Sequence, residues 1–124
     1  MEVTHVALAG SERAWPAEVE RTGKRPDPAA PLDVTIVVRG PVADDLLAVQ
    51  RFATDYDLLV LESDVARRSI RVRGSIAQLE RAFDVRFEMG TAGGAPRRLR
   101  EGTIAIPYDL ADTIADVLGL EERA

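Results

Sequence analysis

The stretch VRGSIAQLERAFDVRFEM, Val72 to Met89, carries the strongest secondary-structure signal in this chain. Around its start, apolar residues alternate with arginines, which predicts a strand with one buried face: Ile70, Arg71, Val72 and Arg73. Gly74 breaks this pattern, and Ser75 is placed to cap a helix whose apolar stripe consists of Ile76, Leu79 and Phe83. Alternation then returns at Val85, Phe87 and Met89. The stretch predicts a strand, a turn, a helix and a strand, and we find no catalytic residue in it.

A strand that returns to a second strand through so short a helix favours a split β-α-β unit. In such a unit the two strands are parallel, and another strand lies between them. The connecting helix then covers one face of the sheet only. We therefore expect an opposite face that is solvated, covered by the ends of the chain, or docked on a partner.

The residues before this unit predict the rest of the sheet. LDVTIVVR, Leu32 to Arg39, predicts a first strand that is apolar enough to be central, because Val34, Ile36 and Val38 point to one side. Gly40 and Pro41 end this strand, and the helix that follows has an apolar stripe at Val42, Leu46, Val49, Ala53 and Tyr56. Residues 58–63 and 68–73 then predict a hairpin of two strands.

Both ends of the chain are expected to add to this core. Residues 1–31 contain scattered glycines and the run RPDPAAP, which predict an extended arm with Trp15 as its packing anchor. TAGGAP, residues 91–96, predicts a flexible loop, and residues 97–106 a short strand or extended segment. Pro107 is expected to open a last helix, which Gly119 ends, with an apolar stripe at Leu110, Ile114, Val117 and Leu118.

This order of elements predicts an α+β fold with a ferredoxin-like β-α-β-β-α-β core. We expect an antiparallel sheet in the strand order fourth, first, third, second, with both helices on one face. The N-terminal arm over residues 1–31 and the C-terminal helix are additions to this core. We expect a single domain overall, in which residues 32–124 form the α+β part.

Composition limits the possible functions. The 124 residues fit one domain that buries about two-thirds of its unfolded surface. No stretch approaches the roughly 20 apolar residues of a spanning helix, and the N-terminus lacks the pattern of a signal peptide. We therefore expect no membrane partner, and the compartment stays open between the cytoplasm and export. The net charge of -5 argues against a nucleic-acid partner.

We find no pattern that predicts a catalytic, cofactor or metal site. Cysteine is absent and His5 is the single histidine, which disfavours zinc binding and thiol chemistry. None of the serines lies in a G-x-S-x-G motif, and Ser75 is better explained as a helix cap. The glycines near residue 93 do not form a phosphate-binding loop. Adjacent carboxylates such as Asp44 and Asp45 diverge on a helix, so we assign them to the surface.

Arginines are the feature left for recognition, since Lys24 is the only lysine among 16 basic residues. Strand alternation predicts that the sheet face opposite the helices carries a mixed set of side chains: Thr35, Val37, Arg39, Ser69, Arg71, Arg73, Arg86 and Glu88. One interpretation is an ordinary solvated face. The other is a protein-docking face whose arginines meet carboxylates or the carboxyl ends of helices. The candidate docking residues are Arg39, Arg71, Arg73, Arg86 and Glu88.

Several segments, taken in order, resemble the activation domain of the sedolisin (kumamolisin-type) serine-carboxyl peptidases. These are GSER at residues 10–13, PDP at 26–28, PLDVTIVVR at 31–39, DLLAVQRFATDYDLLV at 45–60, VRGSIAQLERAFDV at 72–85 and GTIAIPYDLADTIADVLGLEER at 102–123. Nearly the whole chain is covered. The order and spacing of these segments, rather than any one motif, carry the resemblance.

The resemblance implies a non-enzymatic α+β prodomain that packs on its peptidase, assists its folding and blocks its active site. It implies no catalytic residue here, because the family's Ser-Glu-Asp machinery belongs to a much later domain. Two departures from the family pattern stand out. The long insertion that usually precedes the first helix is missing between Arg39 and Pro41, and the chain ends at Ala124, where precursors continue into a linker.

Three functional hypotheses follow. The first is a propeptide-like domain whose protein partner is a sedolisin-type peptidase, for which it serves as folding assistant and inhibitor. The second is a free-standing adaptor or scaffold domain with the same fold and a different partner, which the two departures would favour. The third is a small-molecule-binding or enzymatic domain of ferredoxin-like fold, which would need a polar pocket that the sequence does not indicate.

Overall fold

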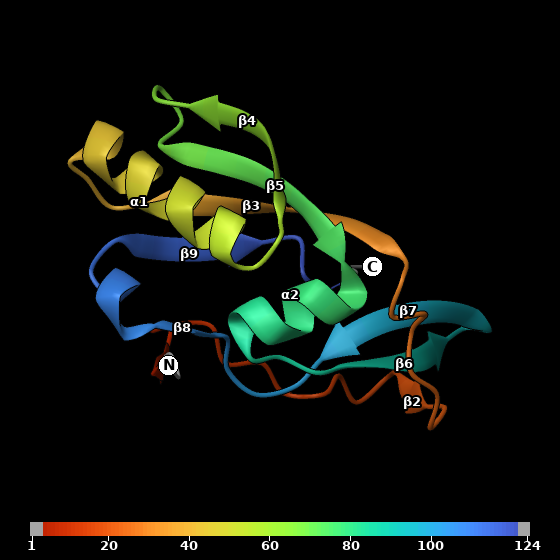
Figure 1. Ribbon diagram of the computed structural model, residues 1–124. Coiled ribbons are helices and arrows are strands. Elements are labelled where there is room, and N and C mark those ends of the chain that lie inside the picture. The colour runs from red at the N-terminus through yellow and green to blue at the C-terminus, as the bar shows by residue number, and fades with distance from the viewer. Residues whose placement is uncertain (1–3, 122–124) are drawn as a thin grey trace.

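The computed structural model describes residues 4–121, and it has an α+β fold with antiparallel sheets and two α-helices (Figure 1). In chain order the elements are β1 His5–Ala7, β2 Glu20–Arg21, β3 Pro31–Val38, α1 Val42–Asp55, β4 Leu59–Asp64, β5 Ser69–Ser75, α2 Ile76–Phe83, β6 Phe87–Ala92, β7 Ala95–Arg100, β8 Ala105–Pro107, the 3-10 turn η1 Tyr108–Leu110 and β9 Ile114–Leu118.

The main sheet has four strands in the order β4-β5-β3-β9, and every neighbouring pair is antiparallel. The first three predicted strands take their expected order of second, third and first, but β9 holds the place expected for the strand predicted around residues 85–89. The sheet is compatible with a ferredoxin-like core. Strand β3 lies inside the sheet because its apolar residues alternate, so that Val34, Ile36 and Val38 are buried on one face. The residues between them point to the other face of the sheet, which no helix covers, and they are only half-buried.

Both helices pack on the same face of the main sheet (Figure 1). The buried stripe of α1 consists of Leu46, Val49, Phe52 and Ala53, and that of α2 of Ile76, Leu79, Ala82 and Phe83. The two stripes meet where the rings of Phe52 and Phe83 lie 5.5 Å apart. Ser75 caps α2 as predicted, because its side chain accepts from the backbone of Gln78 while the Gln78 side chain accepts from the backbone of Ser75.

The prediction of a C-terminal helix is wrong. After η1, the chain enters β9, which pairs with the edge of β3 and so supplies the fourth strand of the main sheet. The apolar spacing was ambiguous because Ile114 and Val117 are buried in a strand that contains an irregularity opposite Val37. Pairing with the open backbone edge of β3 outweighs the helical pattern, and β-branched residues favour a strand.

The strand predicted around Val85 to Met89 exists but belongs to another sheet. Strand β6 begins at Phe87 and lies in a three-stranded sheet of order β2-β6-β7. It is therefore not parallel to β5 in one sheet, and the main sheet takes β9 in its place. The expected loop TAGGAP is mostly strand: Gly93 and Gly94 have φ values of 59° and 81° and form the two-residue turn of the β6–β7 hairpin.

The N-terminal arm lies along the domain and contains two short strands. Strand β1 pairs with β8, and β2 pairs with β6. Leu8 and Val19 are buried, so the arm contributes to the hydrophobic interior. Trp15 is partly buried, donates from its ring nitrogen to the backbone oxygen of Val19 at 2.8 Å, and carries the guanidinium of Arg21 over its ring at 4.1 Å. These contacts support its predicted role as an anchor.

Within residues 4–121, no helix is both long and apolar enough to span a membrane.

Candidate docking surface

The face of the main sheet opposite the helices is the candidate docking surface, and we call it the open face. Strand register defines it, because residues directly opposite each other on paired strands share a face. Across the four strands it is formed by Leu59, Glu62 and Asp64 on β4, Ser69, Arg71 and Arg73 on β5, Asp33, Thr35 and Val37 on β3, and Asp116 and Leu118 on β9. None of these side chains is buried, and Leu59 and Leu118 are 59% and 42% exposed. The face is therefore accessible to a partner.

A ladder of ion pairs crosses three strands of the open face. Asp33 lies opposite Arg73 and receives two hydrogen bonds from its guanidinium, at 2.6 and 3.2 Å. Arg71 is 3.5 Å from the same carboxylate and 3.4 Å from Glu62. Two of the four predicted docking arginines, Arg71 and Arg73, are thus already paired with carboxylates of this chain. The ladder is therefore a nearly neutral array rather than a pair of free cations.

The ladder changes the protonation equilibria of its members. Hydrogen bonding from Arg73 is the largest effect on Asp33, and together with the charges of Arg73 and Arg71 it lowers the pKa of that carboxyl. The same hydrogen bond and charge raise the pKa of Arg73. Asp33 and Arg73 therefore both stay charged at neutral pH, and their ion pair persists there.

Beside the ladder, the open face has a small polar hollow of about 110 Å³. Two carboxylates, two guanidinium groups and two hydroxyls line it: Glu62, Asp64, Arg67, Arg71, Thr35 and Ser69. Arg67 lies 3.7 Å from Asp64, so the charges within the hollow are paired as well. The hollow is too small for a metabolite-sized ligand, which needs about 300 Å³ or more, but it can receive one polar side chain of a partner.

Of the five predicted docking residues, the structure brings only Arg71 and Arg73 together on the open face. Arg39 lies beyond the end of β3, where the backbone is irregular, and its backbone N–H donates to the carbonyl of Thr113 at 2.9 Å. Arg86 and Glu88 were expected on this face because β6 was taken as a strand of the main sheet.

That expectation is wrong, since β6 pairs with β2 and β7 instead. Arg86 lies in a shallow groove beside α2 that Arg25, Glu80 and Arg81 also line. Glu88 forms an ion pair with Arg21 at 3.0 Å. Both residues therefore belong to surfaces away from the open face.

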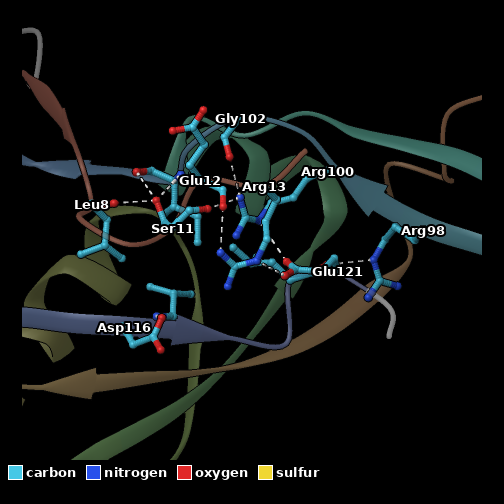
Figure 2. A network of polar contacts seen from close by, with 12 residues as sticks. Leu8, Ser11, Glu12, Arg13, Arg98, Arg100, Gly102, Asp116 and Glu121 are labelled. Atoms are coloured by element: carbon cyan, nitrogen blue, oxygen red, sulfur yellow. Dashed lines mark hydrogen bonds and ion pairs between the residues drawn. The ribbon is translucent and has the colours of Figure 1, made fainter. Parts of the chain in front are cut away.

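A buried arginine cluster, which the sequence did not indicate, holds the two ends of the described chain together (Figure 2). Arg100 ends β7, within the segment predicted to be a short strand or extended, and its side chain is only 2% exposed. It donates to a Glu121 carboxylate oxygen at 2.9 Å and to the backbone oxygens of Ser11 and Gly102 at 2.9 and 3.1 Å. Arg13 lies 3.6 Å from the other oxygen of Glu121.

The same cluster fixes the course of the chain after β9. Arg98 donates to the backbone oxygen of Leu120 at 3.1 Å, and the Leu120 side chain is fully buried. Figure 2 shows Arg13 and Arg100 turned toward Glu121, with Arg98 on its other side. The arm, the β6–β7 hairpin and the end of β9 are thereby joined. The only sequence signal for this cluster was the closeness of Arg98 and Arg100 in a stretch with apolar neighbours.

No metal-binding group of side chains is found among residues 4–121, and the contacts of His5 are structural. These residues contain no group of three or more histidine, cysteine, aspartate or glutamate side chains that could hold a metal ion. His5 lies between the arm and the helices, with its Nε2 atom 3.2 Å from the backbone oxygen of Ala82 and 3.4 Å from the hydroxyl of Tyr56. These contacts are those of a packed structural histidine.

Taken together, the described residues form a small α+β domain whose main sheet has helices on one face and is uncovered on the other. Comparison with family models identifies the group: residues 37–123 match the model described as "Pro-kumamolisin, activation domain". This match spans well over half of the chain, and the chain belongs to that family. Activation domains of the family are non-catalytic propeptides of peptidases. A search of curated proteins found no significant match.

Proposed function

We propose that this chain is a propeptide-type domain that binds a sedolisin-type serine-carboxyl peptidase, assists its folding and inhibits it. The observation that carries the proposal is the family match over residues 37–123. The open face supports it, because a sheet with helices on one face and accessible apolar and paired charged residues on the other has a surface available for a partner. We propose no enzymatic activity for the chain itself.

We further propose that the open face is the peptidase-binding surface, with Arg71 and Arg73 as parts of it. Their role differs from the simple attraction of a partner's carboxylates. Because Asp33 and Glu62 hold them in place, little side-chain freedom is lost when a partner covers them. The exposed side chains of Leu59 and Leu118 at the two sides of the ladder would supply the apolar contacts.

The test is an inhibition assay with mature, purified sedolisin-type peptidases and the 124-residue chain. We expect a complex and loss of peptidase activity with a cognate enzyme. Leu118→Lys on the open face should weaken inhibition at least about tenfold, the effect of losing one central apolar contact. Leu47→Lys is the matched control, because Leu47 is similarly exposed at 49% but lies on α1, which covers the other face of the sheet.

The outcomes separate the hypotheses. A complex that Leu47→Lys weakens and Leu118→Lys does not would contradict the open face as the binding surface. Absence of both a complex and inhibition with every such peptidase would contradict the proposed function, and the adaptor hypothesis would replace it. Charge reversal at Arg73 is not a suitable test, because it would place a carboxylate directly opposite Asp33 and strain the sheet itself.

A further inference from the structure

Strand β4 is an edge of the main sheet, and within residues 4–121 it pairs with β5 alone (Figure 1). Its outer side therefore carries backbone N–H and C=O groups without a strand partner. Such an edge is a template on which another extended chain can add as a further strand. The side chains of β4 determine whether such an addition is favourable and which strand fits.

The side chains of β4 are the most exposed of any long strand in the fold. None of the residues Leu59–Asp64 is buried. Six large apolar side chains are exposed among the described residues, and three of them lie in β4 or in the turn that follows it: Leu59 at 59%, Val60 at 36% and Val65 at 63%. An edge that is both unpaired and apolar favours pairing.

The second half of β4 has the opposite character. Glu62 and Asp64 both point to the open face, and a register irregularity between Val60 and Glu62 interrupts the pairing with β5. The carboxylates contact Arg71 at 3.4 Å and Arg67 at 3.7 Å. Since these pairs are partly exposed, and a carboxylate has room for about four hydrogen bonds, each can also receive a cation from an added strand.

We propose that the outer edge of β4 is a strand-addition site for an extended, basic segment of a protein partner. The segment lies antiparallel to β4, with lysine or arginine opposite Glu62 and Asp64 and an apolar side chain opposite Leu59. Backbone hydrogen bonds to the edge provide affinity, and the two charged positions and the apolar position determine direction and register.

A second copy of this chain fits the edge poorly. Antiparallel self-pairing of residues 59–64 that passes over Leu61 in both copies sets Leu59 opposite Asp64 and Glu62 opposite the Glu62 of the other copy. Asp64 would then lie against an apolar side chain, and the two Glu62 carboxylates would repel each other, without either gaining a cation. The net charge of -5 adds repulsion between copies. Charge complementarity therefore selects a basic partner segment over self-association.

The test uses the full chain and a synthetic hexapeptide, Lys-Thr-Lys-Val-Val-Thr, capped at both ends. In an antiparallel pairing that passes over Leu61, as β5 does, its lysines lie opposite Asp64 and Glu62 and its second valine opposite Leu59. Nuclear magnetic resonance titration should show shift changes concentrated in residues 59–64 and slower amide exchange there. The matched peptide Glu-Thr-Glu-Val-Val-Thr should bind at least about tenfold more weakly, because two cross-strand attractions become repulsions.

Two controls separate strand addition from simple charge attraction. A lysine peptide methylated at alternate backbone nitrogens keeps its charge but loses its backbone donors, and it should not bind. In the protein, Leu59→Lys should abolish binding of the lysine peptide, whereas Leu118→Lys, on the opposite edge strand β9, should leave it unchanged.

Equal binding of the lysine and glutamate peptides, or of the methylated peptide, would overturn the proposal. Slow exchange of the β4 amides in the protein alone, together with a concentration-dependent dimer in sedimentation, would overturn it in favour of a second copy. The proposal does not depend on peptidase inhibition, which is measured separately with Leu118→Lys. Failure of one test therefore leaves the other interpretable.

Discussion

Replacement of Glu121 by glutamine should destabilise the domain, because it removes the counterion of a buried arginine. Arg100 is 2% exposed at its side chain, and Glu121 is 14% exposed and lies 2.9 Å away. Removing one partner of a buried pair costs about 3 to 5 kcal/mol. We expect about 3 kcal/mol, the lower end of this range, because Arg100 keeps its hydrogen bonds to the backbone of Ser11 and Gly102.

The assay is equilibrium unfolding in urea, followed by circular dichroism. A loss of about 3 kcal/mol should also lower the melting temperature by about 10 °C in a domain of this size. Arg13→Gln is the matched control, since it removes a more distant ion pair with the same carboxylate from an arginine that is 42% exposed. It should cost less than about 1 kcal/mol.

A double variant completes the test. Arg100→Met combined with Glu121→Gln removes the charge as well as its partner, so it should recover much of the stability that Glu121→Gln loses. The reasoning is refuted if Glu121→Gln costs less than about 1 kcal/mol, or if the double variant is less stable than Glu121→Gln alone. The first result would mean that water, rather than Glu121, solvates the Arg100 guanidinium. The second would mean that the hydrogen bonds of Arg100 to Ser11 and Gly102 contribute more than its unpaired charge costs.

Three further outcomes are expected. Arg73→Gln should raise the pKa of Asp33 toward its ordinary value, as measured by a carbon-detected magnetic resonance titration. In the native chain, the lowered pKa of Asp33 stabilises the fold at pH values above the pKa of the unfolded carboxyl. This stabilisation is lost as the pH falls through the pKa of Asp33 in the folded state. An unchanged Asp33 titration would contradict the ladder. Ser75→Ala should lower the free energy of unfolding, measured in urea, by about 1 kcal/mol, because the capping box of α2 is lost. An unchanged free energy of unfolding would contradict a stabilising role of this cap. Gly90→Ala should displace the arm and alter Trp15 fluorescence, because an added Cβ would lie 2.8 Å from the Trp15 ring; an unchanged spectrum would show that the arm adapts.

The sequence predicted well those elements whose signals lie within a few residues of each other. Alternation identified β3 and the β4–β5 hairpin, and the proline, the acidic first turn and the apolar stripe identified α1. The serine cap and apolar stripe identified α2. These signals are local because backbone geometry and capping depend on neighbouring residues.

The candidate site was predicted only in part, because it depends on which strands share a sheet. Alternation placed Arg71 and Arg73 on the uncovered face correctly, since both lie on β5. It could not show that Asp33 lies opposite Arg73, nor that Arg86 lies in a groove beside α2, because pairing partners are distant in sequence. The sequence thus predicted a mixed face that contains arginines, and the structure adds that Arg71 and Arg73 on this face are paired with carboxylates of the same chain.

By itself, the sequence determined the α+β class, helices α1 and α2, the faces of β3 and β5, and the resemblance to an activation domain. Each of these rests on local periodicity or on the order of short segments. The tertiary structure alone decided that Ile114–Leu118 completes the main sheet, that β6 joins another sheet, and that Arg100 is buried against Glu121. The physical reason is that an open strand edge and a buried charge are satisfied by whichever distant groups the fold brings to them, and a local pattern does not specify those groups.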